Sequence, residues 1–486
     1  MIQNNRQKVA AKGKGTSNIK DKNTSALHQA SIAKLRKALK GRLILPDDAQ
    51  YDRARTVYFG GIDRRPAMII QAADAEDVAR AVTLAAESGM ELAVRSGGHS
   101  AAGHSVCEGG IVLDLRNMKT LRIDPKKHTA WVETGLTAGE YTTAADAYNL
   151  ATGFGDTGSV GIGGLTLGGG IGYLSRKHGL TVDNLQAAKL VTADGQQLHV
   201  DGENHPDLYW AIRGGGGNFG VATRFQFKLH EVGKVLGGML LLPATPEVIT
   251  NFITEAESAP EELSTIANIM PAPPMPFLPA EHHGKLILMG MMVYAGNIEE
   301  GMGAVAPFRK MAQPLADMLR PMHYPEMFPG EEGEYHPLAL GRPMFIDGVD
   351  HEAARAMIEY LQASDAPMRV AQLRVMGGAI SRVLNEATAF AHRHRRIMVN
   401  LATFYTSPED KEKRLSWLAD FASALHQNEP GAYVNFLGDE SEEQVRAAYP
   451  GSTWERLSEI KARYDPTNLF RINHNIRPKT TPKKAK

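Results

Sequence analysis

One histidine of this sequence follows two glycines, in the run Arg95-Ser96-Gly97-Gly98-His99-Ser100 that comes after a short apolar segment. Glycine lacks a Cβ atom, so the backbone at this point can approach a flat ligand closely. By residue type alone, a loop histidine that caps a backbone group is the better interpretation. His99 becomes a candidate binding residue only in combination with the glycine-rich segments that follow it.

The densest run of glycines lies at residues 153–184, and apolar side chains are interleaved with them. Flexible linkers are instead polar and rich in Gly and Ser. Successive backbone amides in such a run can form nests that bind anions. We therefore interpret residues 153–184 as a loop that binds a phosphate or pyrophosphate, rather than as a linker.

Two matches to the dinucleotide pattern G-x-G-x-x-G also occur, at Gly153-Gly155-Gly158 and Gly215-Gly217-Gly220. A Rossmann site requires this pattern after a strand and at the start of a helix. The first match follows a helix predicted to end near Leu150, and the second precedes an alternating strand at 221–229. Neither context fits, so the sequence excludes a nicotinamide Rossmann domain. It also lacks the Gly-x4-Gly-Lys-Ser/Thr pattern of a P-loop.

The elements that must position these loops fall into two groups. Up to about residue 235 a βαβ pattern dominates: Asp74 is the predicted N-cap of a helix to Ser88, and Thr137 with Glu140 forms a capping box that opens a helix to about Leu150. Strands are predicted at 68–71, 91–95, 111–115 and 129–133, with a hairpin turn at Asp194-Gly195. Further on, strands are predicted at 240–243, 285–294, 371–376 and 398–405, and helices at 246–258, 351–363, 408–426 and 454–464.

Charge and composition limit the classes of partner. Lys and Arg number 54 and Asp and Glu number 54, so the net charge is zero, which argues against nucleic acid or an anionic membrane as a main partner. The single cysteine, Cys107, excludes a disulfide framework, and we expect it to be a buried apolar residue in a reducing compartment. No apolar run reaches about 18 residues, so we expect no membrane span and a soluble cytoplasmic protein.

Both ends of the chain are predicted to be tails. Residues 1–42 are basic and interpreted as a solvated tail whose end, 31–42, forms a basic helix; 479–486 form a second tail. A nucleic-acid or membrane-surface role for the basic tail is a weaker alternative.

Taken together, these motifs resemble the FAD-binding module (PCMH type) of the vanillyl-alcohol oxidase superfamily, in its berberine bridge enzyme-like branch. The resemblance implies an α+β fold, with a two-subdomain FAD-binding domain at 43–235 and a substrate domain at 236–432 whose antiparallel sheet is covered by helices. A berberine bridge enzyme-like segment at 433–478 would return to the FAD domain. The matching segments are residues 95–100, 108–115, 159–180, 207–221, 388–393, 433–435 and 464–470.

In this family the histidine of the RSGGH motif is bonded to the 8α-methyl group of FAD, which implies a covalent bond to His99. Asn184 and Val221 would lie near the adenosine half of the cofactor. The full set of implied contacts is Arg95, Ser96, Gly97, Gly98, Ser100, His104, Ser105, Thr157, Gly158, Val160, Gly161, Ile162, Gly163, Gly164, Gly168, Gly169, Gly170, Gly172, Tyr173, Gly179, Leu180, Asn184, Gly220 and Val221. We assign no metal ligands.

One departure from the family concerns a second covalent bond. Bicovalent members carry a cysteine that is bonded to C6 of the flavin, within a Cys-Pro-Thr-Val-Gly run. Here the corresponding run is Thr157-Gly158-Ser159-Val160-Gly161, and threonine cannot form that bond. The resemblance therefore implies FAD attached at His99 alone.

The chemistry implied is hydride transfer from a small organic substrate to flavin N5. Tyr433 is the first candidate base, with Asn435 orienting it, although a free tyrosine has a pKa of about 10 and needs a cation or hydrogen bonds to act near neutral pH. A core aromatic is the alternative for Tyr433, and Gln372 and His392 are weaker candidates. A small residue at Val160 is typical of relatives that react with oxygen, which favours an oxidase that releases hydrogen peroxide.

Two other functions stay open: an FAD dehydrogenase with a different electron acceptor, and a flavin-binding protein without catalysis. The sequence does not identify the substrate or the oligomeric state. A set of methionines would line an apolar pocket or belong to the core; these are Met275, Met289, Met291 and Met292.

Overall fold

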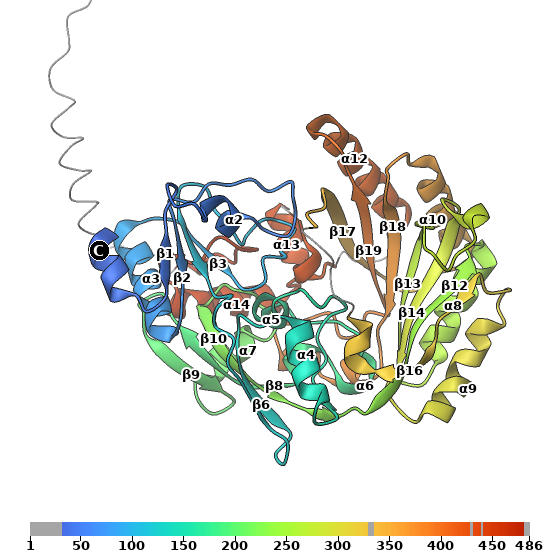
Figure 1. Ribbon diagram of the computed structural model, residues 1–486, viewed down its shortest axis with the longest axis horizontal. Coiled ribbons are helices and arrows are strands. Elements are labelled where there is room, and N and C mark those ends of the chain that lie inside the picture. Colours follow the sequence, from blue (N-terminus) through green and yellow to red (C-terminus); the bar gives the residue numbers. More distant parts are fainter. Residues whose placement is uncertain (1–31, 329–334, 428–430, 439–440, 481–486) are drawn as a thin grey trace, which may run out of the picture.

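The computed structural model describes residues 32–328, 335–427, 431–438 and 441–480. Within this part of the chain two lobes lie side by side (Figure 1). The first lobe contains a four-stranded, a five-stranded and a two-stranded sheet, and the second contains one eight-stranded sheet. None of the described helices is both long and apolar enough to cross a bilayer.

The four-stranded sheet of the first lobe has the order β1-β2-β4-β3. Strands β2, β4 and β3 are parallel, and β1 is antiparallel to β2. Helix α3 (Ala75–Ser88) follows β2, and its N-cap is Asp74, whose side chain accepts a hydrogen bond from the Asp77 amide, as predicted. The strand bounds are β1 Arg42–Ile44, β2 Met68–Gln71, β3 Leu92–Arg95 and β4 Ile111–Asp114.

The predicted N-terminal tail extends too far. Residues 1–31 lie outside the described residues, and 32–38 form a helix, but Arg42 begins β1 and pairs with Gln71. The backbone amides of Lys40 and Gly41 donate to the buried Asp77 carboxylate at 3.0 and 2.7 Å. The ordered structure therefore starts before residue 43, because this carboxylate binds the segment in front of β1.

The five-stranded sheet is antiparallel throughout, in the order β5-β6-β10-β8-β9. The predicted turn at Asp194-Gly195 is confirmed: it joins β8 to β9, and Gly195 has a φ of +80°, which suits glycine. The strand bounds are β5 Leu121–Asp124, β6 Thr129–Glu133, β8 Leu185–Val191, β9 Gln197–Asp201 and β10 Val221–Lys228.

Helix α4 (Ala138–Asp146) begins with the predicted capping box of Thr137 and Glu140. It ends four residues before the predicted Leu150, because Asn149 has a φ of +54° and its amide closes a turn onto Asp146. Leu150–Ala151 instead form β7, which pairs with β11 (His230–Glu231). The remaining elements of the lobe are α2 Tyr51–Arg55, α5 Ile162–Leu167, α6 Ser175–His178, η1 Thr181–Asp183 and α7 Pro206–Ala211.

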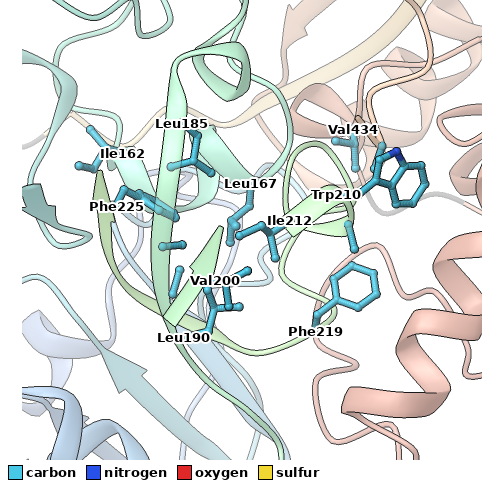
Figure 2. Close-up of a cluster of buried hydrophobic side chains, with 14 of the residues drawn as sticks. Ile162, Leu167, Leu185, Leu190, Val200, Trp210, Ile212, Phe219, Phe225 and Val434 are labelled. Carbon is cyan, nitrogen blue, oxygen red and sulfur yellow. The ribbon is translucent and has the colours of Figure 1, made fainter. Parts of the chain in front are cut away.

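The core of the first lobe includes residues from the end of the chain. Figure 2 shows Val434 beside Trp210 in the cluster that also contains Phe219 and Phe225. Leu457 of α14 (Ser452–Tyr464) belongs to the same cluster. Burying large apolar side chains such as these contributes about 1.5–3 kcal/mol each. The C-terminal segment is thus part of the first lobe's core.

A buried ion pair fixes this segment further. Lys461 and Asp465 are both fully buried, with Nζ and Oδ2 2.7 Å apart. Lys461 Nζ also donates to the carbonyl oxygens of Asn218, at 2.7 Å, and Phe470, at 2.8 Å. These three acceptors match the three N–H donors of the ammonium group, as a buried charge requires. Asn218 belongs to the second glycine-rich match, so α14 lies directly against that loop.

The eight-stranded sheet of the second lobe is antiparallel, with the order β15-β12-β14-β13-β18-β19-β17 and β16 paired to β12. Helices α8, α9 and α10 lie on the side away from the first lobe (Figure 1). The strand bounds are β12 Lys234–Pro243, β13 Leu263–Pro271, β14 Leu286–Tyr294, β15 Ala316–Asp317, β16 Arg320–His323, β17 Ala339–Ile346, β18 Arg369–Val375 and β19 Ile397–Phe404. The helix bounds are α8 Pro246–Ser258, α9 Ile298–Arg309, α10 His351–Ala363, α11 Ala379–Arg382 and α12 Pro408–Ala424, with short η turns at Ala280–His282, Tyr324–Met327 and Asn385–Ala387. The turn Val434–Phe436 and helix α13 Glu442–Ala447 belong to the C-terminal segment, whose Val434 and Val445 lie in the first lobe's core.

The two faces of this sheet have different roles. On β19, Val399 and Leu401 join the apolar core beneath the helices. Asn400 and Ala402 point to the opposite face, as the two-residue period of a strand requires, and line a cavity against the first lobe. The second lobe therefore uses one face for stability and the other for the site.

Strands β13 and β17 and helix α9 of the second lobe were not predicted, nor were its short elements β15, β16 and α11. Strand β13 is buried on both faces over Leu263–Ile269, which removes the alternation that marks a strand in sequence. Strand β17 contains Gly341 and Pro343, and α9 contains two glycines and Pro307. These residues are unfavourable in strands and helices, and tertiary packing overrides that preference here. The predicted domain boundaries at 235 and 432 stay a proposal.

Candidate active site

A cavity of about 460 Å³ lies between the two lobes. Its walls come from the loop after β3, the glycine-rich loops of the first lobe, strands β17 and β19, and the C-terminal segment. Cavities for cofactors and small molecules are roughly 300–1,000 Å³. No Lys or Arg is among the described residues that line it, so backbone amides and neutral side chains are the donors that it offers to an anion.

Most of the predicted cofactor contacts lie on the wall of this cavity. The glycine loops touch one another there: a Cβ atom on Gly97 would be 2.2 Å from the Gly161 nitrogen, so the two backbones form one continuous wall. Predicted residues that line the cavity are Ser96, Gly97, Gly98, His99, Ser100, His104, Ser105, Thr157, Val160, Gly161, Gly163, Gly164, Gly220, Val221, Tyr433 and Asn435.

A smaller set of the predicted contacts is not on the wall. These residues are Arg95, Gly158, Ile162, Gly168, Gly169, Gly170, Gly172, Tyr173, Gly179, Leu180 and Asn184. Arg95 is fully buried beneath its loop, where the guanidinium donates to the carbonyl oxygens of Ala54, Arg55 and Ser105. Asn184 bonds to the carbonyl oxygens of His178 and Leu180. Both side chains hold loops in place instead of facing the cavity.

Not every amide of the glycine-rich loop is available to a ligand. The Ile162 amide donates to the Leu136 carbonyl oxygen at 3.0 Å, and the Gly163 amide lies 3.2 Å from Ser96 Oγ. Open space surrounds the α carbon of Gly164, where an added Cβ would meet nothing within 4 Å. The anion-binding role predicted for this loop is therefore left to fewer amides than the sequence suggested.

The glycines at 168–170 were predicted to contact FAD, but they do not line the cavity. Gly168 and Gly169 lie against the C-terminal residues Asn435 and Tyr433. A Cβ atom on Gly168 would be 2.0 Å from Asn435 Oδ1, and one on Gly169 would be 3.3 Å from the Tyr433 ring. Gly169 and Gly170 also have φ values of +128° and +79°, which other residues rarely adopt. The bare backbone of Gly168 and Gly169 allows Tyr433 and Asn435 to pack against the loop, so these glycines lie behind the two side chains and not on the cavity wall.

Three N–H groups surround the Tyr433 hydroxyl oxygen. The donors are the amides of Gly170, at 2.9 Å, and Ile171, at 3.3 Å, and Asn435 Nδ2, at 2.9 Å. Burial raises the pKa of Tyr433, and the three hydrogen bonds and the nearby charge of Arg374 oppose that rise. Hydrogen bonds to the ionised form favour it, so this arrangement favours a phenolate more than burial alone would allow.

A buried hydrogen-bond chain reaches the cavity from the second lobe. Arg374 of β18 forms an ion pair with Asp156, which lines the cavity, and donates to Gln372 Oε1. Gln372 Nε2 in turn donates to Asn268 Oδ1 at 2.8 Å, and the Thr157 hydroxyl lies 3.3 Å from Asp156 Oδ1. The Arg374 guanidinium also lies 4.9 Å from the centre of the Phe436 ring. Gln372 thus orients Arg374 and is not itself on the wall.

Several lining residues were missed by the sequence analysis. Tyr58 and Phe59 precede the first motif, and no spacing marks them as functional. Ala339–Gly341, Asn400 and Ala402 line the wall because of the face that β17 and β19 turn to the first lobe. His474 contacts His104 edge-on at 4.7 Å, and it comes just after the 464–470 motif, which was a signal for this region.

Other predicted candidates lie elsewhere. Cys107 is buried, as predicted, and burial raises its pKa to about 11. The methionines pack into apolar clusters and do not line the cavity, so they give no support for an apolar substrate. His392 is 4% exposed and stacks on Phe345 at 4.7 Å, away from the cavity wall.

The residues present fit FAD. The wall combines glycine backbone, which allows a large planar group to approach, with the hydroxyls of Ser96, Ser100 and Ser105. Backbone amides and hydroxyls can bind a pyrophosphate without a side-chain charge. Imidazole His99 is on the same wall, where it can reach a bound ring.

Comparison with known families agrees with this site. Residues 66–201 match the FAD binding domain, and residues 432–477 match the berberine and berberine-like family. A relative from Bacillus subtilis, the uncharacterized FAD-linked oxidoreductase YgaK, is 31% identical over 456 residues, which cover 90% of this chain and 97% of the relative.

Two solved structures share the fold. The 6-hydroxy-D-nicotine oxidase from Arthrobacter nicotinovorans is 26% identical, and the match covers 91% of this chain and 99% of that one with a TM-score of 0.81. The glucooligosaccharide oxidase from Acremonium strictum is 24% identical, with coverage of 93% and 100% and a TM-score of 0.81. The predicted α+β fold of the PCMH type is confirmed.

This fold and cavity define an FAD-dependent oxidoreductase. Within that class, the chain belongs to the family of FAD-linked oxidoreductases with a berberine bridge enzyme-like C-terminal segment.

The buried position of His392 generates a prediction on acid stability. Burial is the main cause that lowers its pKa to about 4, from about 6.5 for a free histidine. The unfolded chain then takes up a proton below about pH 6.5 that the folded chain refuses down to about pH 4. Stability from this group is thus present at neutral pH and lost as the pH falls across that window.

We therefore expect His392→Gln to reduce the loss of unfolding free energy between pH 7 and pH 4.5 by about 2–3 kcal/mol. Urea unfolding at both pH values measures this, with His394→Gln, at an exposed neighbour, as the control. An identical acid dependence in wild type and His392→Gln would contradict the prediction.

Proposed function

We propose that this chain is an oxidase that holds FAD through a covalent bond to His99. It oxidises a small organic substrate, such as an alcohol, a sugar or a C–N centre, and passes the electrons to dioxygen to give hydrogen peroxide. Bound FAD supplies the hydride acceptor, and the protein supplies position and acid-base groups. The observation that carries the proposal is that His99, the glycine loops and the Tyr433–Asn435 pair line one cavity.

The family supports a histidyl bond. The Acremonium glucooligosaccharide oxidase is described with a 6-S-cysteinyl, 8α-N1-histidyl FAD. In the present chain His99 lies in the matching motif and on the cavity wall. The residue at the cysteine position is Thr157, which also lines the cavity, and Cys107 is not among the lining residues. These positions support a single bond at His99.

The site also supports Tyr433 as the base. A substrate hydroxyl must lose a proton as its hydride leaves, and a positioned general base contributes about 10²–10⁴-fold. Tyr433 lines the cavity, and its oxygen is held by two backbone amides and by Asn435. In this proposal Asn435 positions Tyr433, because its amide also donates to the Leu165 carbonyl oxygen and so is fixed in the loop.

The covalent bond has a direct test. When the purified yellow protein is precipitated with acid, we expect the flavin colour to stay in the pellet. His99→Ala should release it to the supernatant, because the bond has no other attachment point. His104→Ala removes a second imidazole from the same wall and should keep the colour in the pellet. Free flavin from wild-type protein would contradict the covalent bond, and colourless protein would contradict the flavin itself.

Removing the Tyr433 hydroxyl should slow substrate oxidation. We expect Tyr433→Phe to lower kcat by about 10²–10⁴-fold while FAD stays bound, since the ring is kept and the base is lost. Flavin reduction by the substrate, found in a peroxide-coupled screen, measures the effect. Tyr173→Phe is the control, because Tyr173 is buried but does not line the cavity. Wild-type turnover in Tyr433→Phe would remove Tyr433 from the base role.

Reoxidation distinguishes an oxidase from a dehydrogenase. We expect reduced enzyme mixed with air-saturated buffer in a stopped-flow instrument to reoxidise within seconds and to release one hydrogen peroxide per flavin. Val160→Leu should slow that reaction, because Val160 lines the cavity and added bulk there would hinder oxygen. Reduced enzyme that persists for minutes in air would instead favour a dehydrogenase with another acceptor.

A further inference from the structure

A stacked ring contact covers one face of the His99 imidazole. The Tyr58 ring lies parallel to it, with centroids 4.0 Å apart and an angle of 22° between the planes. Both residues line the cavity. Tyr58 lies in the loop after α2, 41 positions before His99 in the chain. It belongs to none of the sequence motifs.

The backbone near His99 cannot by itself fix the imidazole. His99 follows Gly97 and Gly98, and Gly98 has a φ of +83°, in the region where glycine is favoured. The stacked Tyr58 ring is one contact that limits how the imidazole can turn. Tyr58 is well placed for this because its amide donates to the Gly98 carbonyl oxygen at 3.1 Å, which ties the two loops together next to the stacked rings.

Tyr58 is itself held from the second lobe. His336 Nδ1 lies 3.2 Å from the Tyr58 carbonyl oxygen, and the Gly60 amide donates to the Pro337 carbonyl oxygen at 3.1 Å. A Cβ atom on Gly60 would be 2.6 Å from the His336 carbonyl oxygen. The loop that carries Tyr58 thus meets the segment leading into β17 at very close range.

From these contacts we propose that Tyr58 is a positioning residue for the attachment of FAD to His99. Its ring would hold the plane of the imidazole for the bond between a ring nitrogen and the 8α carbon of bound FAD. The contact with residues 336–337 completes this arrangement when the lobes are packed together. The inference rests on the covalent bond proposed above.

One bond forms between a ring nitrogen of His99 and the 8α carbon. The imidazole loses its N–H proton and the methyl group loses one proton, both to solvent. The electron pair left by these losses enters the flavin ring and is then removed by dioxygen, which becomes hydrogen peroxide. Tyr58 gains and loses nothing in this sequence, because its contribution is orientation.

The test measures how fast the bond forms. Full-length variants are purified, incubated with excess FAD in air, and sampled for total bound FAD and for the fraction that resists acid precipitation. We expect Tyr58→Ala to bind FAD but to acquire the covalent bond about twofold to twelvefold more slowly than wild type, which is the range that the contribution of an aromatic stack predicts. Tyr58→Phe keeps the ring and should restore the wild-type rate.

Controls separate this role from general stability. Phe252→Leu changes a buried ring in the second lobe's apolar core, which does not line the cavity, and should attach FAD at the wild-type rate. Wild-type kinetics in Tyr58→Ala would overturn the inference and leave the covalent bond intact. If Tyr58→Ala binds no FAD, the rates of covalent attachment in Tyr58→Leu and Tyr58→Phe are compared instead. Equal rates would overturn the inference, and a slower rate in Tyr58→Leu would support it. Wild-type protein without covalent flavin would overturn both this inference and the bond on which it rests.

Discussion

The Tyr433 hydroxyl accepts hydrogen bonds from the backbone amides of Gly170 and Ile171, in a loop that lies 263 and 262 residues away in the chain. The backbone of this loop approaches the C-terminal segment so closely that a Cβ atom on Gly168 would lie 2.0 Å from Asn435 Oδ1, and one on Gly169 would lie 3.3 Å from the Tyr433 ring. The same packing brings Val434 into the core of the first lobe and places Asn435 against the Leu165 carbonyl. The cavity wall on this side exists because these glycines have no Cβ atoms.

Buried ion pairs also hold distant segments of the chain together. Arg393 is fully buried and forms a two-pronged pair with Asp183, with both N–O distances 2.7 Å, next to the first lobe's Asn184. The Arg374–Asp156 ion pair likewise joins the second lobe to the first, at the cavity. Such pairs add little net stability over apolar packing, but removing one partner leaves a costly buried charge. They therefore favour one arrangement of the lobes over others.

The sequence could predict those features that depend on contacts between neighbouring residues. The cap at Asp74, the turn at Gly195 and the loop around His99 depend on neighbours in sequence, and these agree with the structure. The contacts of Gly168 with Asn435 and of Gly169 with Tyr433 were not predicted, because these partners are remote in the sequence. Tyr58 and Asn400 carry no local signal at all. Whether a strand residue such as Asn400 faces helices or a cavity is decided by how the lobes pack, which residue order alone does not specify.

The distribution of charge ties the fold to the chemistry. Among the described lining residues Asp156 is the one carboxylate, and Arg374 neutralises it from behind the wall, where the guanidinium lies against Phe436. A cavity without net charge costs little to desolvate when a large neutral ring enters it. Hydride transfer to a bound flavin would add negative charge to that ring, and oriented amides stabilise such charge without reorganising. The bare backbone of the glycine loops would then serve two purposes, because it admits the cofactor and its remaining amide dipoles can stabilise the charge that reduction adds.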